Sequence, residues 1–389
     1  MRVGHGVAPL PVPLGSPLGG YVDRPGPSTG TADPLEVHVV TISAGTHRLA
    51  LVVLDVVCVN TDLAAAVRQA LSGIALDDVW TCATHTHSGP ETGCVPGGGA
   101  TPAPWTSVIA AAAASAAHAA VAAETPGSLT AAEVFVAEVA SVRSRPDGAR
   151  PVPVDVVSFH RADGRLGGAL AVLPIHPTVL PASSTVVSAD LSGAVRRALA
   201  DRLGTWVVAL TGAAGDISTR GVRRAADPAE CARLGDIVAN QAARAVRTGP
   251  ATDIVRTAAA DVLLSPGAPP TDRSTVDPLS RQGDTLRQAW RVRRTRTDPL
   301  PATVRAARVG DVSLVGLPGE PFLDLRSRAI AAAGPLLLIG YVGGYVGYLP
   351  TREAFAADPT YETVVSPVAP GEPERLLDTA VNLLSRLMP

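Results

Sequence analysis

The chain has 389 residues, which is enough to bury a large hydrophobic core. Hydrophobic residues make up 46% of it, charged residues only 17%, and the formal net charge is −2, so the composition excludes a global electrostatic preference for nucleic acid or anionic membranes. All 33 basic residues are arginine, and the absence of lysine excludes Schiff-base and P-loop lysine chemistry. A small, near-neutral partner fits this composition best.

Short runs of β-branched apolar residues alternate with helical patterns in the first third of the chain. The predicted elements there are strands at 37–42, 48–57 and 79–83, and helices at 62–72 and from about 104 to 125. The second helix is uncharged over residues 105–123 and long enough to raise a membrane question, but it is mostly alanine with polar residues inside it. We expect a buried helix and no transmembrane segment.

The rest of the chain continues this alternation, with turns at Asp163-Gly164 and Gly310-Asp311 that each predict a β-hairpin. The other predicted elements are strands at 154–159, 169–173, 206–210, 254–264 and 336–339, helices at 191–203, 228–247, 322–333 and 372–387, a loop at 265–275, and a basic cluster at 287–296 that forms a solvated helix face. Because parallel and antiparallel strands must mix, the predicted fold class is α/β, a mixed β-sheet core flanked by helices. Neither an internal repeat nor a linker is evident, so a single domain over residues 1–389 is expected.

The four cysteines form neither a CxxC pair nor a dense framework, which indicates reduced structural thiols rather than a zinc finger or a disulfide scaffold. Prolines interrupt the N-terminus before any continuous apolar core of the length that a secretory signal needs. We therefore expect a cytoplasmic protein, and the sequence predicts no particular oligomeric state.

A pair of histidines, His85 and His87, follows the predicted strand 79–83 in the run THTHSGP at 84–90. Residues two apart in an extended segment point the same way, so both imidazoles can face one cavity. One of them can then ligate a metal while the other handles protons. The same pair is also compatible with ordinary polar loop residues. The chain has no GxSxG elbow, no HExxH and no GxGxxG after a strand.

Other polar residues stand near the ends of predicted strands. They are His176 between two prolines, Asp190 in SAD at 188–190, Asp216 in GAAGDIS at 212–218, Glu320 in GLPGE at 316–320, and three of the five tyrosines in a glycine-rich run at 340–348. Each has a structural explanation, since an imidazole can bond backbone, a carboxylate can cap a helix and aromatic residues can pack in a loop. Together, however, they lie where α/β enzymes assemble their sites.

The order of these motifs resembles the catalytic domain of neutral/alkaline non-lysosomal ceramidases, especially its shorter bacterial relatives. The motifs that carry the resemblance are LGGY at 18–21, ADPL at 32–35, THTHSGP at 84–90, HPT at 176–178, SAD at 188–190, GAAGDIS at 212–218, LPGE at 317–320 and GYLPTRE at 347–353. The resemblance implies a zinc-dependent amide hydrolase with the ceramidase-like catalytic fold. It also leads us to expect no counterpart of the C-terminal immunoglobulin-like domain of the long ceramidases.

The resemblance implies a ligand set for Zn²⁺ formed by His85, His176, Glu320 and Tyr348. Such nitrogen and oxygen donors, without thiolate, suit this ion and leave a coordination position for water. The resemblance also gives His87 a role in handling protons at the reacting amide.

The resemblance also implies that Arg143 and Tyr361 act with His87 and stabilise the oxyanion. Tyr361 matches the family's tyrosine after a shift of one residue. Neutral ligand histidines must each donate their outer ring N–H to an acceptor. Asp190 and Asp216 are the predicted acceptors.

The chain departs from the family pattern at two places that bear on the substrate. Pro90 is followed by Glu91-Thr92-Gly93 instead of two glycines, and Arg220 replaces an asparagine. The predicted substrate is therefore an N-acyl amine smaller than ceramide. Two alternatives stay open: a zinc esterase or phosphoesterase that uses the same site, and a non-catalytic binding protein that retains the fold.

Overall fold

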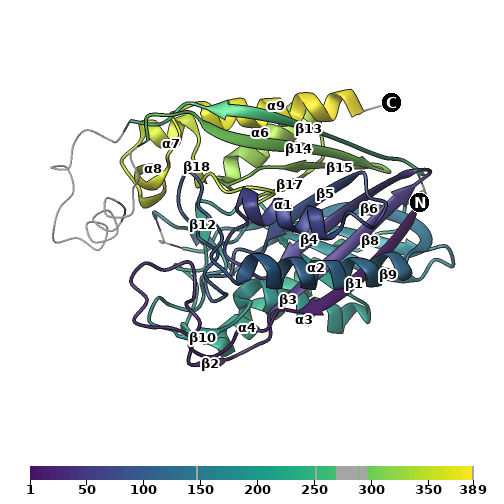
Figure 1. Ribbon diagram of the computed structural model, residues 1–389, viewed down its shortest axis with the longest axis horizontal. Helices are drawn as coiled ribbons and strands as arrows, with labels where there is room; N and C mark the ends of the chain where they lie inside the picture. Colours follow the sequence, from purple (N-terminus) through teal and green to yellow (C-terminus); the bar gives the residue numbers. More distant parts are fainter. Residues whose placement is uncertain (146–147, 250–251, 269–288, 290–295, 388–389) are drawn as a thin grey trace.

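The computed structural model describes residues 1–145, 148–249, 252–268, 289 and 296–387. Two mixed sheets form its centre. The strands of the larger sheet are β1 (Arg2–Pro9), β3 (Glu36–Ala44), β4 (His47–Leu54), β5 (Asp78–Ala83), β6 (Thr125–Val136), β8 (Val152–Arg161), β9 (Leu166–Leu173) and β11 (Val207–Thr211), in the order β11-β9-β8-β6-β1-β3-β4-β5. The smaller sheet consists of β13 (Val255–Leu264), β14 (Leu300–Val309), β15 (Val312–Gly316) and β17 (Leu337–Ile339), in that order (Figure 1).

Short ladders and helices complete the fold. The ladders pair β2 (Gly30–Thr31) with β10 (Val186–Val187), β7 (Ser141–Val142) with β12 (Ile217–Ser218), and β16 (Glu320–Pro321) with β18 (Tyr348–Leu349). The helices are α1 (Thr61–Ala70), α2 (Trp105–Ala122), α3 (Asp190–Leu203), α4 (Pro228–Ala242) with the 3₁₀ turn η1 (Ala243–Ala245), α6 (Leu323–Ala333), α7 (Arg352–Ala356), α8 (Tyr361–Val365) and α9 (Glu372–Leu387).

Three sheet faces enclose one central hydrophobic core. The first is the half of the larger sheet formed by β1, β3, β4 and β5, and the second is the half formed by β6, β8, β9 and β11. The third is the smaller sheet. Strand alternation separates this core from the outer ones: Val40 and Val53 point inward, while Val39 and Val52 point to the helices. The two halves of the larger sheet face each other, since β11 contacts β4 and β5.

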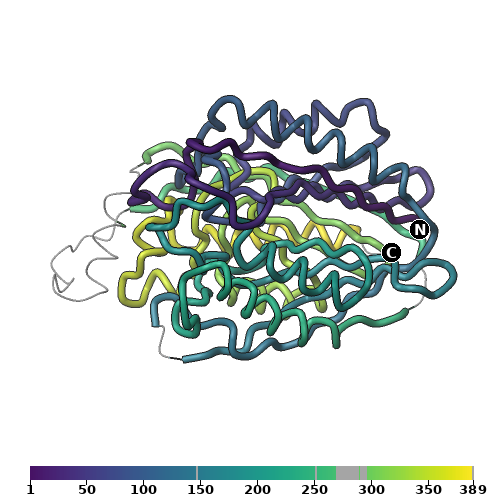
Figure 2. Tube along the Cα trace, turned by 90° about the horizontal axis from the view of Figure 1, so that it is seen from below, coloured from purple at the N-terminus to yellow at the C-terminus, as the bar shows by residue number. Residues whose placement is uncertain are grey.

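A pair of helices covers the outside of each sheet face. Helices α1 and α2 pack on the first half of the larger sheet, α3 and α4 on its second half, and α6 and α9 on the smaller sheet. Figure 2 separates the α1–α2 layer, blue at the top, from the α3–α4 layer, teal at the bottom. The prediction of a mixed β-sheet core flanked by helices is confirmed.

Helix α2 is the long alanine-rich helix that the sequence predicts. By length and composition alone it could cross a membrane, but one face packs against β1 and β3. Glycines in β1 make this packing possible, because a Cβ on Gly4 or Gly6 would lie 1.9 Å from the Ala120 carbonyl oxygen or 2.0 Å from that of Ala116.

Predicted and observed elements agree best where hydrophobic periodicity is strong. The terminal helix has the predicted bounds, and strand β5 differs by one residue. Strands β1 and β6 were missed, since β1 is interrupted by glycines and β6 begins at the Thr-Pro-Gly run interpreted as a helix end. Most of the basic cluster at 287–296 and of the loop at 265–275 lies outside the described residues.

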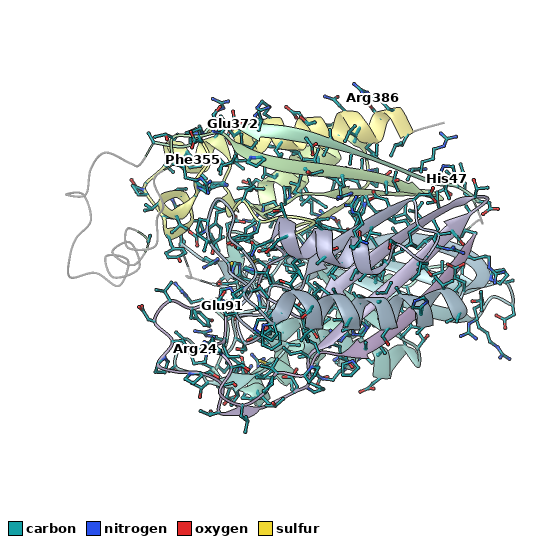
Figure 3. All side chains as sticks on the ribbon, viewed as in Figure 1. Arg24, His47, Glu91, Phe355, Glu372 and Arg386 are labelled. Carbon is teal, nitrogen blue, oxygen red and sulfur yellow. The ribbon has the colours of Figure 1, made fainter. Side chains whose placement is uncertain are left out.

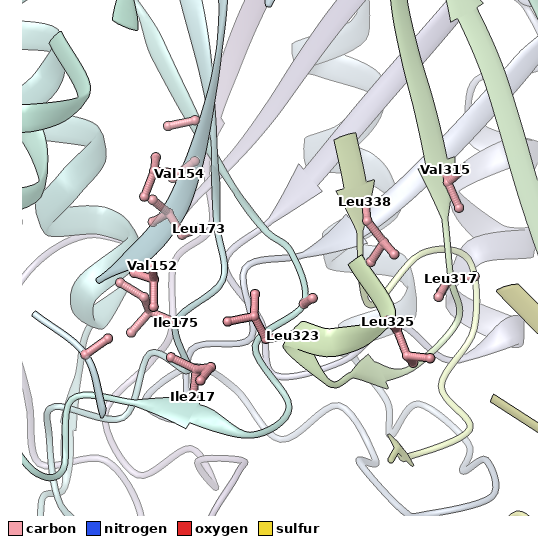
Figure 4. Close-up of a cluster of buried hydrophobic side chains, with 14 of the residues drawn as sticks. Val152, Val154, Leu173, Ile175, Ile217, Val315, Leu317, Leu323, Leu325 and Leu338 are labelled. Carbon is pink, nitrogen blue, oxygen red and sulfur yellow. The ribbon is translucent and has the colours of Figure 1, made fainter. Parts of the chain in front are cut away.

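The carboxyl ends of six strands meet at one end of the central core. Strands β4 and β5, β9 and β11, and β15 and β17 run parallel in pairs. Figure 3 marks the two ends of the molecule: His47 begins β4 at one end, whereas Arg24 and Glu91 lie at the other. Figure 4 shows the apolar side chains that anchor the loops at this second end, among them Ile175, Ile217 and Leu317.

Candidate metal centre

Three buried imidazoles converge at these strand ends. One ligand atom from each of His85, His87 and His176 lies within 4.8 Å of the others. The Nε2 atom of His85 is 2.9 Å from Nε2 of His176 and 3.2 Å from Nε2 of His87. The sequence therefore predicted correctly that both histidines of the THTHSGP run face one site.

The backbone route to this convergence differs from the predicted one. His85 has φ 62°, in the left-handed region, so the loop turns at this residue instead of continuing the extended strand. The His85 ring stacks on Tyr341, with 4.2 Å between ring centroids. Between the two histidines, the Thr86 hydroxyl donates to the Ser188 carbonyl at 2.6 Å, which fixes the turn.

Backbone carbonyls contact the Nδ1 atoms of two imidazoles. Nδ1 of His85 lies 2.6 Å from the Val57 carbonyl oxygen, and Nδ1 of His176 lies 3.2 Å from that of Ala214. A carbonyl only accepts, so a neutral ring that bonds it carries the proton on Nδ1 and a lone pair on Nε2. The Arg143 Nη1 donor lies 3.2 Å from Nδ1 and 3.3 Å from Nε2 of His176, so the contacts of this ring fit either tautomer. Burial, reinforced by the Arg143 charge, holds the pKa of His176 well below its ordinary value, which keeps this ring neutral.

When both rings carry their proton on Nδ1, two lone pairs face each other across 2.9 Å. This arrangement is repulsive by itself and becomes favourable when a cation lies between the nitrogens. The donor set around this point therefore fits a metal ion, which neutral imidazole nitrogens bind.

Glu320 adds a carboxylate to the centre. Its Oε2 atom is 3.5 Å from Nε2 of His85 and 3.8 Å from Nε2 of His176. Tyr345 donates to Oε1 at 2.5 Å and Tyr341 to Oε2 at 3.4 Å. Burial opposes ionisation of Glu320, but the His85 ring, the Tyr345 hydrogen bond and the Arg143 charge outweigh it and lower its pKa. The centre thus combines nitrogen donors with an ionised oxygen donor.

Arg143 lies beside the imidazoles and connects several predicted residues. Its Nη1 donates to the Tyr348 hydroxyl at 3.0 Å and lies 3.3 Å from Nε2 of His176. Its Nε pairs with Glu362 at 3.2 Å. Burial disfavours the guanidinium charge, yet Tyr348 and Glu362 raise the pKa of Arg143, so a permanent positive charge lies at the site.

The two predicted tyrosines lie next to each other behind Arg143. Tyr361, at the start of α8, contacts Tyr348 edge to face, with 6.0 Å between centroids. Burial raises the pKa of Tyr348 well above its ordinary value and that of Tyr361 to about 12, so both are neutral phenols. Tyr348 as a metal ligand and Tyr361 as an oxyanion donor stay predictions.

The two aspartates have a different role from the predicted one. Asp190, at φ 50°, accepts the backbone N–H groups of Val179 and Leu180 at 3.0 and 2.9 Å. Asp216 accepts the Leu323 N–H at 2.8 Å, at the first residue of α6, and burial raises its pKa to about 6. These carboxylates shape the loops behind the site.

The Nδ1 atoms of His85 and His176 contact backbone carbonyls instead. Val57 and Ala214 supply those carbonyls, so the expectation that Asp190 and Asp216 accept these N–H groups is corrected. A backbone acceptor carries no side-chain signature, which is why residue types alone pointed to the aspartates.

A segment near the N-terminus holds the third imidazole. Gly20 has φ +91°, and a Cβ there would lie 2.5 Å from Cγ of His87. The Tyr21 ring meets the His87 ring at 4.8 Å, and Arg24 donates to the His87 carbonyl oxygen and stacks on Tyr21. Burial, with the charges of neighbouring groups, lowers the pKa of His87 well below its ordinary value, so this ring is neutral.

Sequence reasoning assigned no role to several of these residues. Glu362, Tyr341, Tyr345, Gly20 and Arg24 all contact the predicted site residues. Only the density of tyrosines at 340–348 and the LGGY motif at 18–21 gave a signal, and neither specified a partner.

Fold and site together define an α/β protein with mixed sheets and a buried histidine and carboxylate centre at the strand ends. No protein-family model and no curated protein sequence matches the chain. Solved structures do match its fold, and two of them are ceramidases. A ceramidase complexed with C2 has 19% identity and a TM-score of 0.79, and the match covers 99% of this chain and 75% of that one. A neutral ceramidase from Pseudomonas aeruginosa has 19% identity and a TM-score of 0.78, with 99% and 74% covered. The chain thus has a neutral ceramidase-like fold, as the motifs predicted.

Proposed function

We propose that this protein is a zinc-dependent hydrolase that cleaves the amide bond of an N-acyl amine. One observation carries the proposal: the Nε2 atoms of His85 and His176 lie 2.9 Å apart, with the Glu320 carboxylate 3.5 and 3.8 Å away. The ceramidase-like fold supports amide hydrolysis as the reaction.

The reaction is R–CO–NH–R′ + H₂O → R–COOH + H₂N–R′. When bound, Zn²⁺ lowers the pKa of water to about 7 and polarises a carbonyl. His85, His176 and Glu320 would hold the ion, and Tyr348 is the candidate for a fourth ligand. Burial opposes loss of the Tyr348 proton, whereas the Arg143 charge favours it.

Three residues of the chain then act on the substrate. Arg143 places a permanent positive charge, and Tyr361 a neutral hydroxyl, where negative charge develops on the carbonyl oxygen. His87, which is neutral because of its burial, can take up a proton and deliver it to the departing nitrogen. The neutral Tyr361 phenol and the neutral His87 imidazole thus have protonation states that match these roles.

The substrate is proposed to be smaller than ceramide. The basis is the sequence after Pro90 and the arginine at position 220, both of which depart from the ceramidase pattern. Matched amide, ester and phosphate ester substrates separate the reaction classes. Hydrolysis of the phosphate ester alone would make the protein a phosphoesterase and contradict the amide assignment.

Metal analysis of purified wild-type protein and of His85→Ala tests the mechanism. We expect about one zinc per chain in the wild type, and loss of both metal and amide hydrolysis in the variant. His47→Ala is the matched control, because this exposed histidine lies at the far end of the molecule (Figure 3). A wild type without divalent metal, whose hydrolysis is unaffected by His85→Ala, would refute the proposal.

A further inference from the structure

Four arginines surround the imidazole cluster, and three of them have partners. Arg24 donates to the His87 carbonyl, Arg143 pairs with Glu362, and Arg223 donates to the carbonyls of Thr178 and Val179 at 2.6 and 3.0 Å. The guanidinium of the fourth, Arg220, makes no hydrogen bond and no ion pair with any residue that the structure describes.

The backbone fixes Arg220 beside the site. Strand β12 ends at Ser218, which pairs with Ser141 and forms a bridge to His176. Two residues further, the Arg220 N–H donates to the Ser218 hydroxyl at 3.3 Å, and the next N–H, of Gly221, donates to the Ser141 hydroxyl at 3.0 Å. Arg220 therefore leaves a turn whose base contacts a residue of the imidazole cluster.

Arg220 is an exposed residue on this turn. Partial burial of the guanidinium and the positive charges of Arg143 and Arg223 lower the pKa of Arg220, whereas Glu362 and Tyr21 act in the opposite direction. Glu362 is already bound to Arg143.

The other acidic groups nearby are also engaged. Glu320 accepts from Tyr345 and lies against His85, and Asp190 accepts backbone N–H groups. Among the described residues, the groups around Arg220 thus carry an excess of positive charge, and no carboxylate is left to pair with its guanidinium. A guanidinium with free donors is suited to bind a carboxylate through two hydrogen bonds.

We propose that Arg220 binds a carboxylate group of the substrate, so that the enzyme prefers anionic amides such as N-acyl amino acids over neutral N-acyl amino alcohols. This inference rests on the proposed hydrolase function and replaces the near-neutral partner that composition suggested. The reaction becomes R–CO–NH–CHR′–COO⁻ + H₂O → R–COO⁻ + ⁺H₃N–CHR′–COO⁻, in which the C–N bond breaks and both protons of water end on the amine.

Kinetics with matched substrates tests the proposal. N-octanoylglycine and N-octanoylethanolamine share the acyl chain and differ in carrying a carboxylate or a hydroxyl. N-succinyl-octylamine places the carboxylate on the acyl side instead. We expect the wild type to prefer a carboxylate substrate about tenfold or more, and whichever of the two carboxylate substrates it prefers locates the carboxylate.

Variants then assign the preference to the side chain. Arg220→Ala should raise KM for the preferred carboxylate substrate by about 10- to 100-fold and leave the neutral amide unchanged, and Arg220→Lys should recover part of the loss. Arg165→Ala is the control, since this arginine is 84% exposed on the β8–β9 hairpin. Equal effects of Arg220→Ala on both substrate types, or a wild-type preference for the neutral amide, would overturn the proposal.

A binding experiment separates this inference from the proposed reaction. Calorimetry with the His85→Ala protein, which should not turn over substrate, compares N-octanoylglycine binding with and without Arg220→Ala. Binding that is lost in the double variant supports the carboxylate site even when the wild type hydrolyses neither amide, which would refute only the hydrolase function. Binding that is unchanged in the double variant overturns the carboxylate site.

Discussion

Gly20 offers a direct test of how the His87 imidazole is held. Its φ of +91° is natural only to glycine, and an alanine Cβ would lie 2.5 Å from Cγ of His87. Ordinary contacts of a Cβ begin at 3.4 Å, so Gly20→Ala must displace the ring or the loop by about 0.9 Å. Because a misplacement of about 1 Å can reduce catalysis about 100-fold, we expect kcat to fall by about that factor.

Gly15→Ala is the matched control for backbone strain. Gly15 has φ +83°, and a Cβ there meets nothing within 4 Å. Both alanines force a left-handed residue and should lower the free energy of unfolding by about 1–2 kcal/mol, measured by urea titration. Only Gly20→Ala should also lose kcat, measured as initial rates on one N-acyl amide with zinc present. Equal kcat values for the two variants would show that Gly20 does not position the imidazole.

Three further predictions concern packing, protonation and metal affinity. Gly6→Ala places a Cβ 2.0 Å from the Ala116 carbonyl oxygen and should lower the free energy of unfolding, measured by urea titration, by about 3 kcal/mol or more. Gly73→Ala is the control, because a Cβ there meets nothing within 4 Å, and it should lower this free energy by less than about 0.5 kcal/mol. Similar losses in the two variants would contradict the close packing of α2. Burial, with the neighbouring His38 imidazole, lowers the pKa of His5 to about 3. As the pH falls, His5 is therefore protonated in the unfolded chain before it is protonated in the folded chain, and the free energy of unfolding falls from pH 6.5 toward pH 3. His5→Phe should flatten that fall by at most about 1.4 kcal/mol per pH unit, and an unchanged slope argues against the buried neutral ring. Glu320→Gln should weaken zinc binding at least about 100-fold in a chelator competition, and wild-type affinity would exclude the carboxylate as a ligand.

The sequence predicts most of the architecture where local patterns act. Helix α9 and strand β5 were found from periodicity, which burial on one face imposes. Strand β1 was not, because Gly4 and Gly6 are selected by the approach of α2, a segment about a hundred residues away. The short helices α7 and α8 were also missed, since five residues carry too little periodicity.

The same division holds at the site. His85, His176 and Glu320 were noted because imidazole and carboxylate groups at strand ends stand out in a sequence, and the resemblance to ceramidases gave them as metal ligands, which stays a prediction. Their partners did not stand out: the acceptors for the imidazole N–H groups are the backbone carbonyls of Val57 and Ala214, which any residue type can supply. Side-chain chemistry is therefore readable from sequence, whereas its orientation by backbone requires the fold.

Strained backbone conformations gather at the site. Three of the four described non-glycine residues at positive φ, His85, Asp190 and Tyr341, lie at or directly behind the imidazole cluster, and each costs about 1–3 kcal/mol. The burial of the Glu320 charge opposes folding as well. Strain of this kind persists only where the surroundings over-determine it. Here the strand-end loops are bonded to one another, as in the Gly340 N–H donating to the Thr211 carbonyl at 3.0 Å. The imidazoles and the carboxylate are thus held in place by the fold itself.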